Sequence, residues 1–291
     1  MQTWKAEILA KTNLSLGEGA KWHSPWKKFL FVDITGKSVG TADPADGTIR
    51  TVSLQKMPGM VAPTDSDLLI VALEDEIAEL DFKTGETKTI LSFGSDQTGN
   101  RSNDGACDAM GRLWFGTMHK EAKLNAGNLY CYNGQMTKKI TNTSVSNGLC
   151  WSADQKTFYY IDSFCYKITG YDFNLKTGNI TNARTIITIE DRNTLPDGMC
   201  IDKDGMLWVA MWGGGCVNRY NPDTGQLIGK VKVNAPHVTS CSFGGINGNQ
   251  LLVTTARDGL NQEQLETYPD SGSLFMATLD VAGYSASPFT K

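Results

Sequence analysis

Four polar residues of this sequence could contribute oxygen atoms to a metal ion, because each stands immediately before a glycine in a similar motif. They occur in LGEGAKW, RSNDGAC, SNGLCW and PDGMCI, and are Glu18, Asp104, Asn147 and Asp197. Carboxylate and amide oxygens are the ligands that Ca²⁺ and Mg²⁺ prefer. A metal ion held by two carboxylates and one amide of this group would keep coordination positions open for water and a substrate oxygen. A single Asp-Gly or Asn-Gly pair is more often a tight turn, so the motifs alone leave a metal site and a series of turns both open.

A second group of residues could bind hydroxyl groups. Arg101 and Asn103 directly precede Asp104, and Glu121 follows the strand-like run GRLWFGTM. A guanidinium, an amide and a carboxylate beside a metal ion could hold a polyhydroxylated ligand through paired hydrogen bonds. Spacing alone favours a simpler interpretation for Arg101 and Glu121, which is an ordinary ion pair at the surface.

A sequence repeat indicates how these groups could be brought together. Apolar runs rich in β-branched and aromatic residues recur along the chain, bounded by Gly, Asp, Asn and Pro, as is typical of short strands. From Gly105 to Gly148 is 43 residues, and from Gly148 to Gly198 is 50. Steps of 43 residues also lead from Gly19 to Ala62, from Ala62 to Gly105, and from Gly198 to Cys241, which gives six anchor positions in all. The chain therefore contains six units.

Units of this length, each with about four short strands, are typical of propeller blades. The sequence predicts an all-β fold, a six-bladed β-propeller that residues 1–291 form as one domain. The innermost strand of each blade lines the central channel, so the motif residues should converge at one mouth and form a central metal site. The N-terminal segment 4–10, WKAEILA, is expected to close the ring by pairing with the last blade.

Composition and charge argue against several classes of partner. The formal net charge is −4, and no run of basic residues occurs, so no nucleic-acid partner is expected. The N-terminus lacks a signal-peptide pattern, and no apolar stretch reaches about 18 residues. We therefore expect a cytoplasmic monomer without a membrane partner. The absence of HExxH, GxSxG and phosphate-loop motifs disfavours a zinc protease, a serine hydrolase or a nucleotide enzyme.

Cysteine and tryptophan also recur with the repeat. The chain has seven cysteines and no CxxC pair. Four cysteines hold like positions in successive units and are predicted to be small buried residues in the reduced state; they are Cys107, Cys150, Cys200 and Cys241. Four tryptophans recur in the same way and are predicted to pack in the core; they are Trp22, Trp114, Trp151 and Trp208.

The motifs together resemble a known family. LGEGAKW, RSNDGACDAMGRLWFGTM, SNGLCWSADQKTFYYIDS, LPDGMCIDKDGMLWVAM and VTSCSFGG are similar to segments of the family of senescence marker protein (regucalcin), gluconolactonases and luciferin-regenerating enzyme. The resemblance extends over nearly the whole chain and in the same order. It implies a six-bladed propeller with one divalent metal ion, and many members of the family hydrolyse aldonolactones.

The resemblance also implies roles for individual residues. Glu18, Asn147 and Asp197 match the metal ligands, and Asp197 would also be the general base. Arg101, Asn103 and Glu121 match residues that contact the substrate, Glu121 only through its distance from GTM. The implied activity is the metal-dependent hydrolysis of a sugar lactone to the aldonic acid, with the lactone as small-molecule partner. Ca²⁺ is the expected ion, and Zn²⁺, Mn²⁺ and Mg²⁺ are also compatible with oxygen ligands.

Two other functions remain open from the sequence. One is a propeller that binds Ca²⁺ or a sugar without catalysis. The other is a phosphotriesterase-like hydrolase on a similar scaffold. The polar segment 257–272 has no assigned role.

Overall fold

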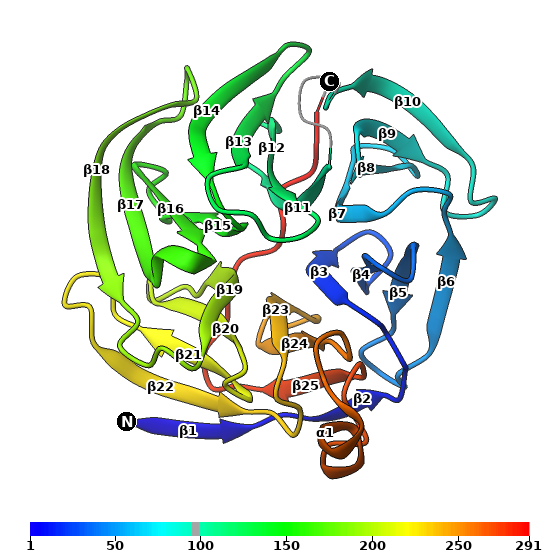
Figure 1. Ribbon diagram of the computed structural model, residues 1–291, viewed down its shortest axis with the longest axis vertical. Coiled ribbons are helices and arrows are strands. Elements are labelled where there is room, and N and C mark those ends of the chain that lie inside the picture. The colour runs from blue at the N-terminus through cyan, green and yellow to red at the C-terminus, as the bar shows by residue number, and fades with distance from the viewer. Residues whose placement is uncertain (95–98, 291) are drawn as a thin grey trace.

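Six β-sheets surround a common axis (Figure 1). The computed structural model describes residues 1–94 and 99–290. The first blade contains β3 (Gly17–His23), β4 (Lys28–Asp33), β5 (Ser38–Ala42) and β6 (Ile49–Ser53). The second contains β7 (Pro58–Pro63), β8 (Leu69–Leu73), β9 (Glu76–Leu80) and β10 (Thr87–Ser92). The third contains β11 (Asn100–Cys107), β12 (Leu113–His119), β13 (Gly127–Tyr132) and β14 (Met136–Thr143).

The second half of the chain repeats this order. The fourth blade contains β15 (Ser146–Trp151), β16 (Thr157–Asp162), β17 (Lys167–Asn174) and β18 (Asn179–Thr188). The fifth contains β19 (Leu195–Ile201), β20 (Leu207–Trp212), β21 (Cys216–Tyr220) and β22 (Leu227–Lys232). The sixth contains β23 (Val238–Gly244), β24 (Gln250–Thr255) and β25 (Leu274–Thr278). The predicted six-bladed β-propeller is confirmed.

The N-terminus closes the ring through two strands rather than one. β2 (Glu7–Ala10) pairs antiparallel with β25 and completes the sixth blade, as the sequence predicted. β1 (Gln2–Lys5) pairs in parallel with β22 and gives the fifth blade a fifth strand, which was not predicted. Ala6, between them, is buried, and its N–H donates to the carbonyl of Lys232 at 2.9 Å. The same short segment therefore joins two neighbouring blades.

Apolar side chains between neighbouring blades form the core. Leu30 and Val32 of the first blade pack against Val61 and Val71 of the second, for example. The inner strands are buried almost throughout, whereas outer strands such as β6 and β10 are largely exposed. Each fully buried side chain of this kind contributes roughly 1.5–3 kcal/mol. The four repeated tryptophans are buried, as predicted.

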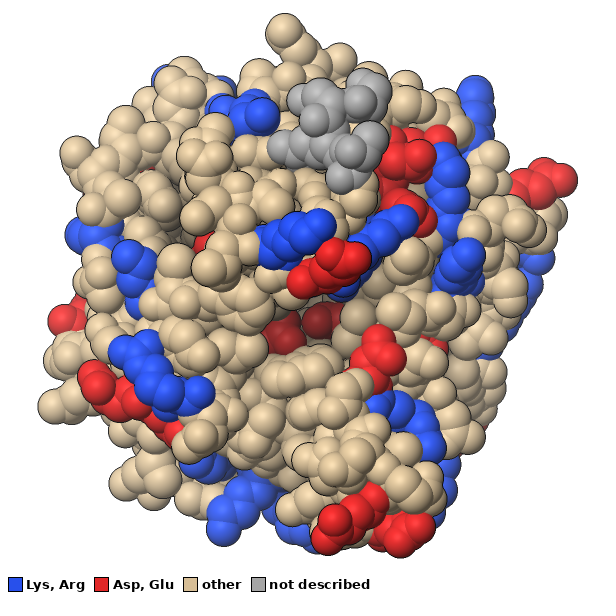
Figure 2. All heavy atoms as spheres, in the orientation of Figure 1, with Lys and Arg blue, Asp and Glu red and all other residues tan. Residues whose placement is uncertain are grey.

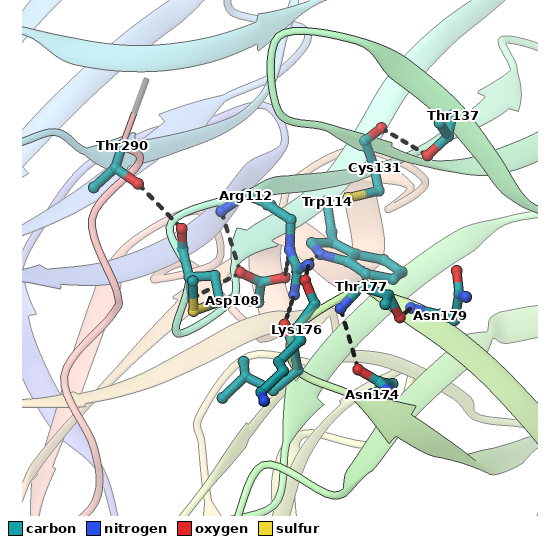
Figure 3. A network of polar contacts seen from close by, with 12 residues as sticks. Asp108, Arg112, Trp114, Cys131, Thr137, Asn174, Lys176, Thr177, Asn179 and Thr290 are labelled. Atoms are coloured by element: carbon teal, nitrogen blue, oxygen red, sulfur yellow. Dashed lines mark hydrogen bonds and ion pairs between the residues drawn. The ribbon is translucent and has the colours of Figure 1, made fainter.

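A buried aspartate organises the turn between the first two strands of a blade. In the third blade, Asp108 Oδ2 accepts hydrogen bonds from Arg112 Nε at 2.6 Å and Trp114 Nε1 at 2.8 Å (Figure 3). Arg112 also donates to the carbonyl of Lys176 in the next blade. Asp202 accepts from the corresponding tryptophan of the fifth blade at 2.8 Å. These bonds satisfy polar groups that would be costly to bury unpaired.

Two further segments lie outside the blades. The helix α1 (Gln262–Thr267) belongs to the predicted polar loop 257–272. Among the residues that the model describes, no helix is long and apolar enough to cross a membrane. The C-terminal segment crosses the propeller behind its centre (red in Figure 1); Gly283 bridges to Asp202, and Phe289 bridges to Thr64.

The inner strands approach each other closely at two glycines. A Cβ on Gly148 would lie 2.5 Å from the carbonyl oxygen of Asp197 in the next blade. A Cβ on Gly198 would lie 2.8 Å from Cα of Ser240. Both contacts are with backbone, which cannot rotate away. Glycine at these positions is therefore a steric requirement of the closed ring.

We expect Gly148→Ala to lower the free energy of unfolding by about 1–3 kcal/mol, because the added methyl group must push two strands apart. Urea denaturation of both proteins would measure the difference. Gly170→Ala is a suitable control, since its nearest contacts at 2.7–2.8 Å are atoms of the Ile186 side chain, which can move. Equal stability of Gly148→Ala and the wild type would contradict the steric argument.

Candidate metal and active site

The three predicted metal ligands lie near the start of three inner strands. Glu18 is in β3, Asn147 in β15 and Asp197 in β19. In each strand the pairing with the second strand of the blade shifts at this point. Such bulges change the direction of a side chain relative to the regular pleat. The shift thus coincides with the residues that the sequence motifs single out.

All three side chains are buried. Glu18, Asn147 and Asp197 are 5%, 4% and 5% exposed. Figure 2 shows a hollow at the centre of one face, with Asp or Glu atoms at its floor. The charges of Glu18 and Asp104 act on Asp197, so these side chains from different blades lie near one another; their roles as ligands stay predictions.

A third carboxyl group belongs to the same cluster. Asp104, in β11, is 4% exposed, and its charge acts on both Glu18 and Asp197. Burial, followed by the charge of Asp104, raises the pKa of Glu18 to about 8. Burial raises the pKa of Asp104, and burial together with the charges of Glu18 and Asp104 raises the pKa of Asp197. The three carboxyl groups lack sufficient positive charge nearby.

These residues fit a divalent cation. Asp197 Oδ1 is buried and has no hydrogen-bond partner, and an unpaired buried oxygen is costly unless a cation contacts it. Within residues 1–94 and 99–290, no three His, Cys, Asp or Glu side chains are grouped so that they alone could hold a metal ion. The amide of Asn147 would therefore have to serve as a ligand. The metal site itself stays a prediction.

The amide of Asn147 is held in one orientation. Its Nδ2 donates to Ser163 Oγ at 3.0 Å, and Ser163 Oγ donates to the carbonyl of Pro196 at 2.7 Å. Asn147 Oδ1 accepts only a long hydrogen bond, 3.3 Å, from Asn103 Nδ2. The nitrogen is thus directed to the protein and the oxygen is left for a cation.

Two aspartates fix the segments that lead into the ligand strands. Asp33, at the end of β4, accepts hydrogen bonds from the N–H groups of residues 15 and 16, both at 2.9 Å. Asp162, at the end of β16, accepts from residues 144 and 145 at 2.9 and 3.0 Å. Both pairs of bonds end two residues ahead of a predicted ligand. They fix the backbone that leads into Glu18 and Asn147.

Arg101 and Asn103, for which substrate binding stays a prediction, lie beside the carboxyl groups. Arg101 is 8% exposed, and its Nη1 donates to Asn103 Oδ1 at 2.6 Å. Burial lowers the pKa of Arg101 to about 10, and the charges of Glu18 and Asp197 oppose that effect. Asn103 Nδ2 donates to the carbonyl of Ser146 at 2.9 Å. These bonds place a cationic group next to the proposed ligands.

Glu121 lies apart from this cluster. It follows β12, its side chain is 72% exposed, and its carboxylate forms an ion pair with Lys123 at 3.1 Å. It does not form the surface pair with Arg101 that spacing favoured, because Arg101 is buried and bonded to Asn103. Substrate binding by Glu121 stays a prediction.

Other charged residues near Arg101 could not be predicted from the motifs. The charges of Asp258 and Glu74 both act on Arg101. Asp258 Oδ2 accepts from Thr35 Oγ1 at 3.2 Å, and Glu74 pairs with Lys120. Neither acid recurs at a fixed position of the repeat. Asp104 does stand before a glycine at the repeated position, but the resemblance to the family assigned it no role as a metal ligand.

Comparison with known proteins identifies the family. Residues 16–257 match the family model described as "SMP-30/Gluconolactonase/LRE-like region". Over 297 residues the chain is 38% identical to regucalcin of Gallus gallus, with 99% of each sequence covered. The chain belongs to the SMP-30/gluconolactonase/LRE-like family. This confirms the resemblance seen in the motifs.

Solved structures of the SMP-30/gluconolactonase/LRE-like family agree. A regucalcin from Agrobacterium tumefaciens, described as a calcium-binding protein, superimposes with a TM-score of 0.95 and is 28% identical over all of both chains. A luciferin-regenerating enzyme superimposes with a TM-score of 0.90, is 30% identical, and covers 98% of this chain and 99% of its own. Family membership supports either a lactonase or a calcium-binding role.

We expect this family member to lose stability, when metal-free, as the pH rises between about 4.5 and 8. In that range the unfolded chain has lost the Glu18 proton that the folded protein retains, so the folded state binds more protons and stability falls with pH. Melting temperatures measured across this range in a chelator should show the fall. Ca²⁺ should restore stability most at the upper end, because it competes with protons for the same oxygens.

The variant Glu18→Gln provides the control for this pH dependence, since a neutral amide imitates the protonated acid. Its metal-free melting temperature should vary less with pH than that of the wild type. An identical pH dependence for both proteins would show that Glu18 does not hold its proton in the folded state.

Proposed function

We propose that this protein is a metal-dependent lactonase that hydrolyses a sugar lactone to the aldonic acid. The observation that carries the proposal is the buried cluster of Glu18, Asp104 and Asp197, with Asp197 Oδ1 unpartnered. A hollow with Asp or Glu atoms at its floor opens at the centre of one face of the propeller (Figure 2). Membership in the SMP-30/gluconolactonase/LRE-like family supports the choice of reaction.

Glu18, Asn147 and Asp197 would hold one divalent cation, with Ca²⁺ the first candidate. When bound, such a cation polarises a carbonyl oxygen and lowers the pKa of water. The carboxylate of Asp197 can accept the proton of the water that attacks the lactone carbonyl carbon. The same proton can then pass to the ring oxygen as its bond to that carbon breaks. Burial and the charges of Glu18 and Asp104 raise the pKa of Asp197, and a bound cation would oppose that rise, so that Asp197 is ionised and can accept a proton.

Arg101 and Asn103 would orient the sugar ring. Arg101 uses Nη1 for Asn103 and for the carbonyl of Ser102, at 2.6 and 2.9 Å, and its other N–H groups can donate to hydroxyl oxygens. Its charge can also stabilise the oxyanion that develops on the attacked carbonyl. Glu121, whose carboxylate is exposed after β12, would contribute a further acceptor for the sugar hydroxyls.

A proton-release assay on a panel of aldonolactones tests the proposal. The purified protein would be stripped of metal and then given Ca²⁺, Zn²⁺, Mn²⁺ or Mg²⁺ separately. Hydrolysis that returns with an ion would support the lactonase and name the preferred ion. Organophosphate esters in the same panel would detect a phosphotriesterase. Absence of turnover with every ion, in protein that binds metal by calorimetry, would overturn the lactonase.

A non-catalytic Ca²⁺-binding role is the second candidate. The regucalcin neighbour that is described as a calcium-binding protein favours it, and it needs only the metal ligands and not the proton acceptor. The calorimetric result above, binding without turnover, would establish it. We further propose that the protein acts as a monomer in the cytoplasm, which gel filtration and fractionation would check.

We expect Asp197→Asn to reduce kcat by about 10²–10⁴-fold, the usual contribution of a general base. Loss of the metal would also stop the reaction, so calorimetry with Ca²⁺ must accompany the assay. Asp154→Asn is the matched control, because Asp154 is an exposed surface residue. Wild-type turnover in a folded Asp197→Asn protein would exclude this residue as base.

We expect Arg101→Lys to raise KM about tenfold with a smaller effect on kcat. Lysine keeps the charge but loses the planar set of donors, and a hydrogen bond to a charged group contributes about 1.5–3 kcal/mol. Arg184→Lys is the control, since Arg184 is exposed and pairs only on the surface with Asp172. An unchanged KM would show that Arg101 does not contact the substrate.

A further inference from the structure

A cavity of about 290 Å³ lies at the opposite end of the inner strands from the carboxyl cluster. All six inner strands contribute to its wall, and in β3, β11, β15 and β19 the lining residues follow Glu18, Asp104, Asn147 or Asp197 by two to four positions. Segment 284–287 of the C-terminal part of the chain also lines it. In Figure 1 that part of the chain passes behind the centre of the propeller. The proposed function does not use this cavity.

Four cysteines of the repeat line this cavity and are free thiols; they are Cys107, Cys150, Cys200 and Cys241. Two of them, on neighbouring inner strands, lie in contact. Cys200 Sγ in β19 and Cys241 Sγ in β23 are 3.7 Å apart. The remaining cysteines have no sulfur contact of this kind among the described residues. Cys200 and Cys241 are therefore a pair and not two isolated thiols.

We propose that Cys200 and Cys241 are a redox-sensitive thiol pair that a peroxide converts to a disulfide between the fifth and sixth blades. A disulfide requires a sulfur separation of about 2.05 Å and closely spaced backbones. The backbones are already close, because a Cβ on Gly198 would lie 2.8 Å from Cα of Ser240. A rotation of the two side chains, with a small movement of the strands, can close the remaining gap.

The reaction balances with a hydroperoxide as the two-electron oxidant. Cys200 is partly exposed and Cys241 is buried, 2% exposed, so the peroxide meets Cys200 first. The Cys200 thiolate attacks one peroxide oxygen, which gives a sulfenic acid and, after protonation, water. The Cys241 thiolate then attacks the Cys200 sulfur and releases a second water. Two thiols and hydrogen peroxide thus give one disulfide and two waters.

The environment makes this oxidation slow. Burial and the contact with Cys241 raise the pKa of the Cys200 thiol, and Lys21 opposes the rise. Because the thiolate is the reactive form, the pair stays reduced until peroxide is in excess. Cys200 also follows Asp197 by three residues in β19, so the bond would tether the strand of the proposed base to β23. The disulfide does not depend on the proposed lactonase activity.

The experiment uses the full chain with Cys165→Ser, which removes an exposed thiol and with it disulfides between molecules through that residue. Folded protein would be treated with excess hydrogen peroxide, and its free thiols counted before and after. We expect two of the six remaining thiols to disappear and to return with dithiothreitol. Peptide mass spectrometry should find the peptides of Cys200 and Cys241 joined, two hydrogen atoms lighter than the sum of the reduced pair.

Three variants in the same background decide the assignment. Cys200→Ala and Cys241→Ala should each abolish the reversible loss of two thiols. Cys150→Ala is the matched control, because Cys150 lines the same cavity, and it should leave that loss unchanged. A different cysteine pairing, or retention of all six thiols in folded protein under conditions that oxidise Cys165 in the wild type, would overturn the proposal. Neither result bears on lactone hydrolysis, which the metal-restoration assay tests separately.

Discussion

Negative charge buried at the axis of the propeller is the interaction on which the site depends. Glu18, Asp104 and Asp197 are each no more than 5% exposed. Burial raises the pKa of all three, and the charges of the neighbouring acids raise the pKa values of Glu18 and Asp197 further. Three buried carboxyl groups so close together are stable only when protons or a cation neutralise their charge. The chain therefore links the protonation of these residues, the binding of a cation and the stability of the inner strands, and none of the three can change alone.

The fold makes this crowding possible by dividing the cluster among separate blades. Asp104, Asn147 and Asp197 reach the axis from successive sheets, and Glu18 comes from the first blade. The cluster exists only when the ring is closed. Closure by β1 and β2 involves the fifth blade as well as the sixth, so the N-terminus is hydrogen-bonded into the same sheet that carries Asp197. The N-terminal residues thus contribute to the geometry of a site at the opposite end of the sheet.

The sequence predicted the architecture better than the contacts of individual side chains. The interval between the glycine motifs predicted six blades, and the common position of Glu18, Asn147 and Asp197 predicted their convergence. A periodic pattern reports what successive units share, so it could not predict the parallel pairing of β1 with β22, which happens once. It also could not place Glu121, because the conformation of a turn depends on local ion pairs such as that with Lys123. Asp104 shows a third limit. Its position in the repeat is visible in the sequence, but its effect on the pKa values of Glu18 and Asp197 depends on distances between blades, which the sequence does not give.

The two ends of the central channel differ because inner strands such as β15 and β19 carry polar side chains near their start and apolar side chains or thiols further along. Asn147 is followed by Leu149 and Cys150, and Asp197 is followed by Met199 and Cys200. The carboxyl groups therefore rest on apolar residues and thiols, and the C-terminal segment covers part of that end. Residues of this kind hydrate charge poorly and so contribute to the burial that raises the pKa values of the carboxyl groups. If the cavity lined by Cys200 and Cys241 were larger or admitted more water, the carboxyl groups would be better hydrated. They would then need a cation less, even though no ligand residue had changed.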